Sequence, residues 1–109
     1  MEPRLPAHLE VAGLIRRVEA AGGFATVLRK GEHDAGTIMI VFTEKDENTR
    51  IYERMPQLDG SRQWQCSKKQ DPENAGEIIS YIQRRGSQDP DLWVVELDIA
   101  DGERFIGLS

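Results

Sequence analysis

The stretch RKGEHDAG, residues 29–36, concentrates side chains that can do chemistry. Arg29 and Lys30 are cations suited to binding a phosphate or a carboxylate. His33 and Asp34 can contribute ligands to a metal ion, or can act as a general base and the carboxylate that orients it. The stretch therefore predicts a small-anion site and, as an alternative, the acid–base part of a small hydrolase or transferase.

The same stretch has the composition of a turn between two strands. Gly31 and Gly36 can supply positive φ angles, and Asp34 can hydrogen-bond to its own backbone. The two glycines have the spacing of a phosphate-binding Walker loop, but no lysine follows Gly36. The apolar run after Gly36 is typical of a strand, whereas a Walker loop leads into a helix. We therefore expect a turn first and a ligand site second.

The remaining reactive side chains are few. His8 and His33 are the only histidines, too few for a metal cluster unless carboxylates complete it. His8, near the N-terminus, is expected to be solvated. Cys66 is the only cysteine, which excludes an intramolecular disulfide and a multi-cysteine zinc site. A cysteine within a strand is more often a packing residue than a nucleophile for His33, so we predict no catalytic residue, no metal site and no cofactor.

A basic and aromatic segment follows between residues 50 and 69. It contains Arg50, Tyr52, Arg54, Arg62, Trp64, Lys68 and Lys69. Aromatic side chains among cations on a sheet are typical of proteins that bind single-stranded RNA. Alternation along a strand would put Lys68 on the face of Trp64 and Lys69 on the other face. We favour an edge hairpin that its charges keep soluble, and we keep a single-stranded nucleic-acid site as an alternative.

Composition narrows the class of protein. The 109 residues fit one domain, residues 1–109, and a hydrophobic content of 39% supports a real core. The 14 basic and 19 acidic residues give a net charge of −5, which disfavours nucleic acids and anionic membranes as partners. The longest apolar run, IMIVF, is far shorter than the ~20 residues of a membrane helix. The N-terminal MEPRLPAHLE lacks the apolar core of a secretory signal, so a cytoplasmic protein is predicted.

Periodicity predicts the elements that must position these residues. Val11, Leu14 and Val18 form one stripe of a helix over about residues 7–21. Strands are predicted over residues 24–29, 37–42, 49–55, 62–68 and 92–99, with a short sixth strand in RFIGL at residues 104–108. A second helix is predicted between Asp71 and Gly86. Its buried stripe is Ala75, Ile78, Ile79 and Ile82.

These elements predict an α+β two-layer sandwich. Short turns between successive strands favour antiparallel pairing. The expected order is α-β-β-β-β-α-β(-β), with a mostly antiparallel five- to six-stranded sheet and both helices on one face. Trp93 is expected in the core, or lining a pocket beside Arg29 and Lys30.

Three stretches resemble a known family. They are LIRRVEAAGGFATVLRKGEHDAGTIMI, the later DPDLWVVEL and the terminal DGERF. They resemble the small bacterial proteins of the domain-of-unknown-function family numbered fourteen ninety-one. The resemblance covers most of the chain and is weakest from Thr43 to Asn74. It implies a single compact cytoplasmic domain, and it carries over no activity, cofactor or catalytic residue.

The sequence favours a non-catalytic module that binds a protein or a small anionic ligand. The expected site residues are Arg29, Lys30, His33, Asp34 and Trp93. A small hydrolase or transferase using His33 and Asp34 ranks second, because no complete set of nucleophile, base and orienting residue is visible. Binding of single-stranded nucleic acid ranks third because of the net charge. Its residues would be Arg50, Arg54, Arg62 and Trp64. A monomer or a homodimer is expected.

Overall fold

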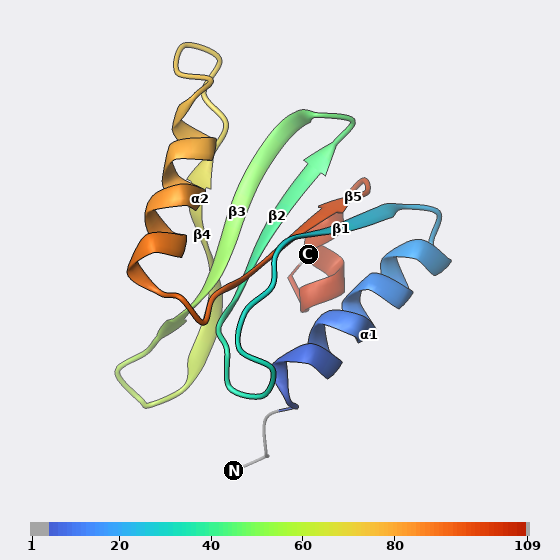
Figure 1. The fold of residues 1–109 in the computed structure, drawn as a ribbon. Coiled ribbons are helices and arrows are strands. Elements are labelled where there is room, and N and C mark those ends of the chain that lie inside the picture. The colour runs from blue at the N-terminus through green and yellow to red at the C-terminus, as the bar shows by residue number, and fades with distance from the viewer. Residues whose placement is uncertain (1–4, 109) are drawn as a thin grey trace.

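The sheet has five strands in the order β1-β5-β2-β3-β4 and lies between two helices (Figure 1). The computed structural model describes residues 5–108. Its elements are α1 (Ala7–Ala20), β1 (Phe24–Arg29), β2 (Ile38–Glu44), β3 (Glu47–Pro56), β4 (Arg62–Lys69), α2 (Glu77–Gln88), β5 (Trp93–Asp98) and the 3-10 helix η1 (Gly102–Ile106). β5 runs parallel to β2, and the other neighbouring pairs are antiparallel. The predicted α+β class, element order and mostly antiparallel sheet are confirmed.

The prediction about the N-terminal MEPRLPAHLE concerns residues 1–4 in part, and these lie outside the described residues. Between residues 5 and 108, no helix combines the length and the apolar character that crossing a membrane requires.

α1 forms where the sequence places its apolar stripe. Val11, Leu14 and Val18 are buried on one side of the helix. Pro6 precedes its first turn, where a fixed φ and a missing N–H cost nothing. The chain leaves the helix through Gly22, whose φ of 91° suits a residue without a β-carbon. The predicted first helix is therefore confirmed.

β2 is apolar on both sides, and this determines the layers. Ile38, Ile40 and Phe42 pack in one core with α1, whereas Met39 and Val41 pack in a second core with α2. β5 alternates in the same way, so the two helices cover opposite faces. The prediction of both helices on one face of a two-layer sandwich is wrong. A fully apolar run fits a strand covered on either one or both faces, and the turns around it do not distinguish these cases.

α2 begins later than predicted. Asp71 accepts the N–H of Glu73 in a preceding turn (2.9 Å), and the helix begins only at Glu77. The side chains that pack against the sheet are Ile78, Tyr81 and Ile82. Ala75 and Ile79, which belonged to the predicted stripe, are exposed. Gly86, predicted to end the helix, is buried within its last turn.

The C-terminal RFIGL is not a sixth strand. Residues 102–106 form η1, which packs Phe105 and Ile106 against the core on the α1 side. Gly102 lies on the ring of Phe42, where a β-carbon would sit 2.6 Å from Cε1. The missing side chain of Gly102 permits η1 to lie this close to the ring.

β1 and β2 are consecutive in the chain but are not neighbours in the sheet, because β5 lies between them. Arg29 at the end of β1 is paired with Val94, and Ile38 at the start of β2 is paired with Trp93. The connecting segment, residues 30–37, must therefore cross the first residues of β5. This crossing determines where the RKGEHDAG stretch, residues 29–36, lies in the fold.

The central position of β2 yields a stability prediction. Ile40 is fully buried, so Ile40→Ala should lower the free energy of unfolding by ~2–5 kcal/mol. Ile79 is 61% exposed, and Ile79→Ala should change it by less than ~0.5 kcal/mol. Urea unfolding followed by circular dichroism measures both. Equal losses in the two variants would contradict the placement of β2 at the centre.

Candidate functional site

The crossing segment passes close to the start of β5, and its glycines permit this. A β-carbon on Gly36 would lie 2.5 Å from the carbonyl oxygen of Asp91 and 2.9 Å from Cδ1 of Trp93. A β-carbon on Gly31 would meet the same two residues still more closely. The sequence predicted positive φ angles here, but the described glycines with positive φ are Gly22, Gly60 and Gly107. Close approach of two backbones, rather than turn conformation, therefore requires these glycines.

Hydrogen bonds fasten the crossing segment to β5. The indole Nε1 of Trp93 donates to the carbonyl oxygen of Glu32 (2.7 Å). The N–H of Glu32 donates to the carbonyl oxygen of Asp91 (3.0 Å). The Glu32 carboxylate also accepts the N–H groups of Asp34 and Ala35. The expected self-bonding role of Asp34 is thus performed by Glu32. Trp93 itself is only 5% exposed and belongs to the core.

The same segment caps α1. The N–H groups of Ala7 and His8 donate to the carbonyl oxygens of Asp34 and His33, both at 2.9 Å. These bonds satisfy donors that every helix N-terminus leaves without a partner, and Pro6 supplies no side-chain cap. The turn interpretation of residues 29–36 is therefore well supported, and the turn has a structural function beyond joining two strands.

The cap brings together three ligand-type side chains. The rings of His8 and His33 stack with centroids 3.5 Å apart. Nδ1 of His33 lies 3.0 Å from Oδ1 of Asp34, and Nδ1 of His8 lies 3.9 Å from the same oxygen. His8 was expected to be a solvated residue outside the site. No local pattern could have found it, because 25 residues separate it from His33.

The other predicted ligand residues lie elsewhere. A β-bulge between Val27 and Arg29 directs Arg29 to the α2 face, where its guanidinium contacts Gly86. Its Nε is buried, and no atom among residues 5–108 accepts a hydrogen bond from it. Lys30 is exposed, and Trp93 is buried on the α1 face. The structure thus separates the predicted anion-binding residues. Arg29 lies on the α2 face of the sheet, Trp93 lies in the core on the α1 face, and Lys30 lies in the exposed loop.

A second bulge rearranges the basic hairpin. It places Lys68 opposite Ile51 on the α2 face, where Lys68 forms an ion pair with Glu77, and Lys69 opposite Arg50. The predicted faces of the two lysines are therefore wrong, because the bulge inserts one residue and reverses the alternation. Lys69 thereby joins the α1 face. The other members of that face are Arg50, Tyr52, Arg54, Arg62 and Trp64.

The two central cations of that face are already engaged. Arg50 donates two hydrogen bonds to Glu103, at 2.6 and 2.5 Å, and one to Glu44. Arg54 forms an ion pair with Glu10, and its guanidinium lies 4.5 Å from the ring centre of Trp64. Phosphate groups would have to displace carboxylates at both arginines. This weakens the nucleic-acid alternative.

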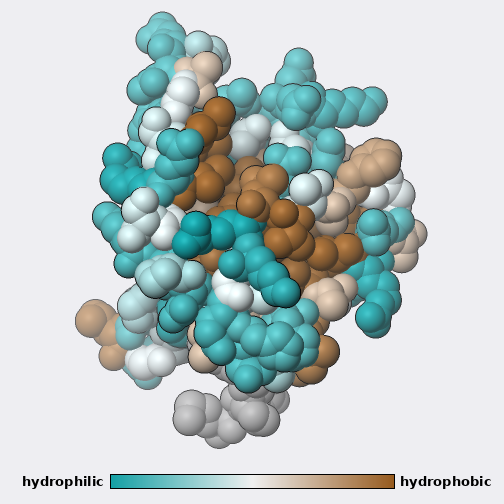
Figure 2. Space-filling view, in the orientation of Figure 1, coloured by the Kyte–Doolittle hydropathy of each residue, from teal (hydrophilic) through white to brown (hydrophobic). Residues whose placement is uncertain are grey.

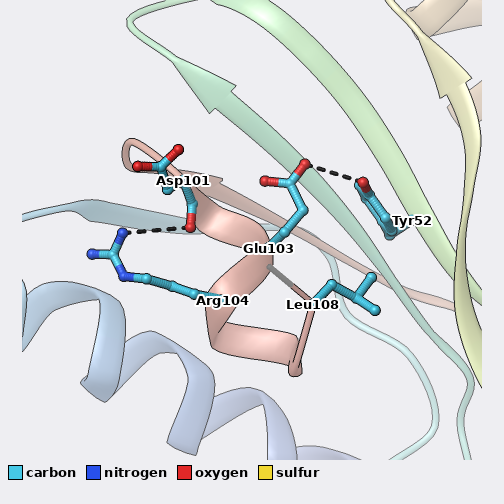
Figure 3. Close-up of a pocket in the computed structure, with 5 residues that line it drawn as sticks. All are labelled: Tyr52, Asp101, Glu103, Arg104 and Leu108. Carbon is cyan, nitrogen blue, oxygen red and sulfur yellow. Dashed lines mark hydrogen bonds between the residues drawn. The ribbon is translucent and has the colours of Figure 1, made fainter.

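A pocket of about 470 Å³ opens beside η1 (Figure 3). Its lining residues are Tyr52, Asp101, Glu103, Arg104 and Leu108. The hydrogen bonds from Arg50 lower the pKa of Glu103 to about 2. Burial and the hydrogen bond to Glu103 raise the pKa of Tyr52 to about 12. The hydrogen bonds thus favour a charged Glu103 and a neutral Tyr52, and this cluster ties η1 to β3.

A buried carboxylate, Glu53, ties α2 to the sheet. It accepts hydrogen bonds from Ser67 (2.6 Å), Tyr81 and Arg85 (2.8 Å). Burial alone would raise the pKa of Glu53, but these three donors lower it below its usual value. The sequence carried a signal for this residue, because alternation places Glu53 on the same side of its strand as Ile51.

Family comparison matches almost the whole described chain. A sequence model described as "Protein of unknown function (DUF1491)" matches residues 5–107. The chain belongs to this family. The predicted resemblance is confirmed, and the description of the DUF1491 family assigns no activity. No curated protein matches the chain.

Solved structures share the DUF1491 fold. A crystal structure of a DUF1491 family protein from Caulobacter crescentus CB15 has a TM-score of 0.82 and 35% identity, covering 95% of this chain and 96% of that one. An NMR structure of a DUF1491 family protein from the same organism has a TM-score of 0.79 and 35% identity over 95% and 94% of the two chains. A solution structure of protein Atu0922 from A. tumefaciens has a TM-score of 0.73 and 33% identity, covering 91% of this chain and 89% of that one.

The crossing yields a prediction about its glycines. Gly36→Ala should lower the free energy of unfolding by ~1–3 kcal/mol, because the new methyl group would overlap Asp91 and Trp93. Gly13 lies within α1 with open space around it, so Gly13→Ala should instead raise the free energy by up to ~1 kcal/mol. Chemical denaturation measures both. Wild-type stability in Gly36→Ala would show that the crossing tolerates a side chain.

The Glu103 cluster yields a pH prediction. The folded-state pKa of Glu103 is about 2, against 4.5 unperturbed, so its stabilisation is present above pH 4.5 and is lost as the pH falls toward 2. With allowance for solvent screening, the loss should be ~1–3 kcal/mol. Glu103→Gln should remove this part of the pH dependence when urea unfolding is compared at pH 7 and pH 3. Glu73→Gln, at an exposed carboxyl, should retain the wild-type dependence.

Proposed function

We propose that this DUF1491 protein is a non-catalytic interaction module that binds an extended basic segment of a partner protein. The partner strand would add to the sheet at the free edge of β1. The observation that carries this proposal is the difference between the two edges of the sheet. Strand addition uses backbone groups for affinity and alternate side chains for specificity.

The two edge strands differ in how they are protected. β4 carries Arg62, Lys68 and Lys69 along its length, and these charges discourage another strand from pairing. Both edge strands contain a bulge, but β1 has no lysine or proline, and its one charged residue is the last. Its side chains of Phe24 and Leu28 are 74% and 47% exposed. An apolar edge without lysine or proline is expected where pairing has a function.

Apolar side chains continue from this edge across the molecule. Figure 2 shows them gathered over the part of the sheet that lies between the two helices. Val27 adds to the surface from the α1 side of β1, with 41% of its area exposed. Contiguous apolar surface on a small domain is typical of an interaction site.

The charge beside β1 indicates the chemistry of the partner. Glu96 and Asp98 of β5 are paired with Thr26 and Phe24 of β1, so they lie on the α2 face directly beside the edge strand. Burial, followed by the charges of Asp46 and Asp98, raises the pKa of Glu96. A lysine or arginine on an incoming strand would relieve this repulsion. A second copy of the chain, with its net charge of −5, would increase it.

The other candidate functions have weaker support. The pair of His33 and Asp34 resembles a base with its orienting carboxylate, but no hydroxyl or thiol among residues 5–108 hydrogen-bonds to His33. A small anion would have to bind where Arg29 and Lys30 diverge and where Glu32 and Asp34 add negative charge. A cytoplasmic location, where the exposed thiol of Cys66 can stay reduced, is part of this proposal.

A pair of peptides tests this function. A short peptide of alternating valine and lysine should shift the amide resonances of residues 24–29 in NMR titrations and slow their hydrogen exchange. A peptide with glutamate in place of lysine should bind far more weakly, because it meets Glu96 and Asp98. Leu28→Lys should abolish binding of the lysine peptide. Ile79→Lys, with the same charge change on exposed α2, should leave it intact.

Three results would contradict the proposal. They are equal binding of the two peptides, shifts confined to residues outside β1, and unchanged binding by Leu28→Lys. Concentration-dependent self-association that Leu28→Lys removes, seen by analytical ultracentrifugation, would identify a second copy as the occupant and overturn the assignment of a basic partner.

A further inference from the structure

The cluster at the N-terminus of α1 contains two imidazoles and a carboxylate. Ligand atoms of His8, His33 and Asp34 all lie within 4.8 Å of one another. We propose that these three residues form a binding site for a divalent transition-metal ion of the zinc type. Imidazole nitrogen and carboxylate oxygen are ligands that Zn²⁺ accepts, whereas Mg²⁺ and Ca²⁺ prefer oxygen alone.

The distances suit a single ion. Ligand atoms about 2.0–2.1 Å from a tetrahedral metal lie roughly 3.3 Å from one another. Nδ1 of His33 lies 3.0 Å from Oδ1 of Asp34, and Nδ1 of His8 lies 3.9 Å from that oxygen. The required value falls between these two distances. Rotation of the two imidazole rings would bring their nitrogens and the Asp34 oxygen to one ion.

The backbone already holds the three residues in place. The N–H groups of Ala7 and His8 donate to the carbonyl oxygens of Asp34 and His33, which fixes α1 against the loop. The Glu32 carboxylate accepts the N–H of Asp34 at 2.9 Å and restrains the loop further. Three ligands on a preformed backbone lose little conformational entropy when the metal binds.

Metal binding would exchange two hydrogen bonds for coordination bonds. Without metal, Nδ1 of His8 lies 3.0 Å from the carbonyl oxygen of His33, and Nδ1 of His33 lies 3.0 Å from Oδ1 of Asp34. Each Nδ1 would give up its proton, and Nε2 would carry the proton in the bound form. The stacked rings, now 19° from parallel, would have to tilt because a nitrogen lone pair lies in the plane of its ring.

The electrostatic balance permits a cation here. A helix N-terminus carries partial positive charge, but carbonyl oxygens of the loop already accept two of its N–H groups. Asp34 and the neighbouring Glu32 add two carboxylates. The side chains of His33 and Asp34 are 62% and 70% exposed, which leaves room for water in the remaining coordination positions. Three protein ligands with an open position are typical of a reactive or bridging zinc site rather than a closed structural one.

Metal titration of the untagged, EDTA-treated chain tests the site. Zn²⁺ should raise the melting temperature by several degrees, because it binds the folded joint between α1 and the loop, whereas Mg²⁺ should not. Co²⁺ should give visible absorption of a complex with nitrogen and oxygen ligands. The side-chain resonances of both histidines should shift together in NMR as their rings separate.

Three variants and a control identify the ligands. His8→Ala, His33→Ala and Asp34→Asn should each weaken Zn²⁺ binding at least ~10-fold. Their folds should persist because the helix cap uses backbone atoms, and circular dichroism checks this. If an alanine variant unfolds, His8→Gln or His33→Gln replaces it. Cys66→Ser removes the one thiol and should bind Zn²⁺ as the wild type does.

The opposite results would overturn the site. Zn²⁺ affinity that survives the loss of both histidines would place the ion elsewhere. Affinity lost in Cys66→Ser would assign it to the thiol. Equal effects of Zn²⁺ and Mg²⁺ on the melting temperature would indicate nonspecific binding to the acidic surface.

Discussion

The rest of the structure depends on one close crossing of the chain. Because β5 is inserted between β1 and β2, residues 30–37 must pass over its first residues. Two glycines permit backbone to lie on backbone there, and the indole of Trp93 fastens the crossing through Glu32. The outer side of the same segment caps α1. One short loop thus joins the first helix, the sheet and the last strand.

The second constraint is the apolar character of the two parallel strands. Side chains of β2 and β5 contribute to both cores, so each face of the sheet needs its own cover. α1 covers one face, and α2, in the long connection to β5, covers the other. Two carboxylates hold the outer elements against the sheet. Glu53 of β3 accepts a hydrogen bond from Arg85 of α2, and Glu103 of η1 accepts one from Arg50 of β3. Each accepts several hydrogen bonds, which the buried Glu53 in particular requires.

Ion pairs within the domain show which charged side chains have a structural role. From the sequence, Arg50 and Arg54 are candidate ligand-binding cations, but both form ion pairs with carboxylates within the domain. The pocket beside η1 is similarly occupied by internal hydrogen bonds. The edge of β1 and the histidine pair at α1 differ, because the side chains of Phe24, Leu28, His33 and Asp34 are well exposed. The two differ in chemistry, because the edge strand offers backbone groups and apolar side chains, whereas the cluster offers imidazole and carboxylate ligands.

The sequence by itself determined the local elements and several of their faces. The strand over residues 24–29 has the predicted bounds, and Trp93 is buried as expected, because periodicity and turn residues act over a few neighbours. Glu53 could have been found from its place on an apolar face. Only the tertiary structure decided the rest. Both bulges reverse side-chain direction, and the approach of His8 to His33 needs the loop to dock on α1. Contacts between residues far apart in the chain leave no periodic trace in the sequence.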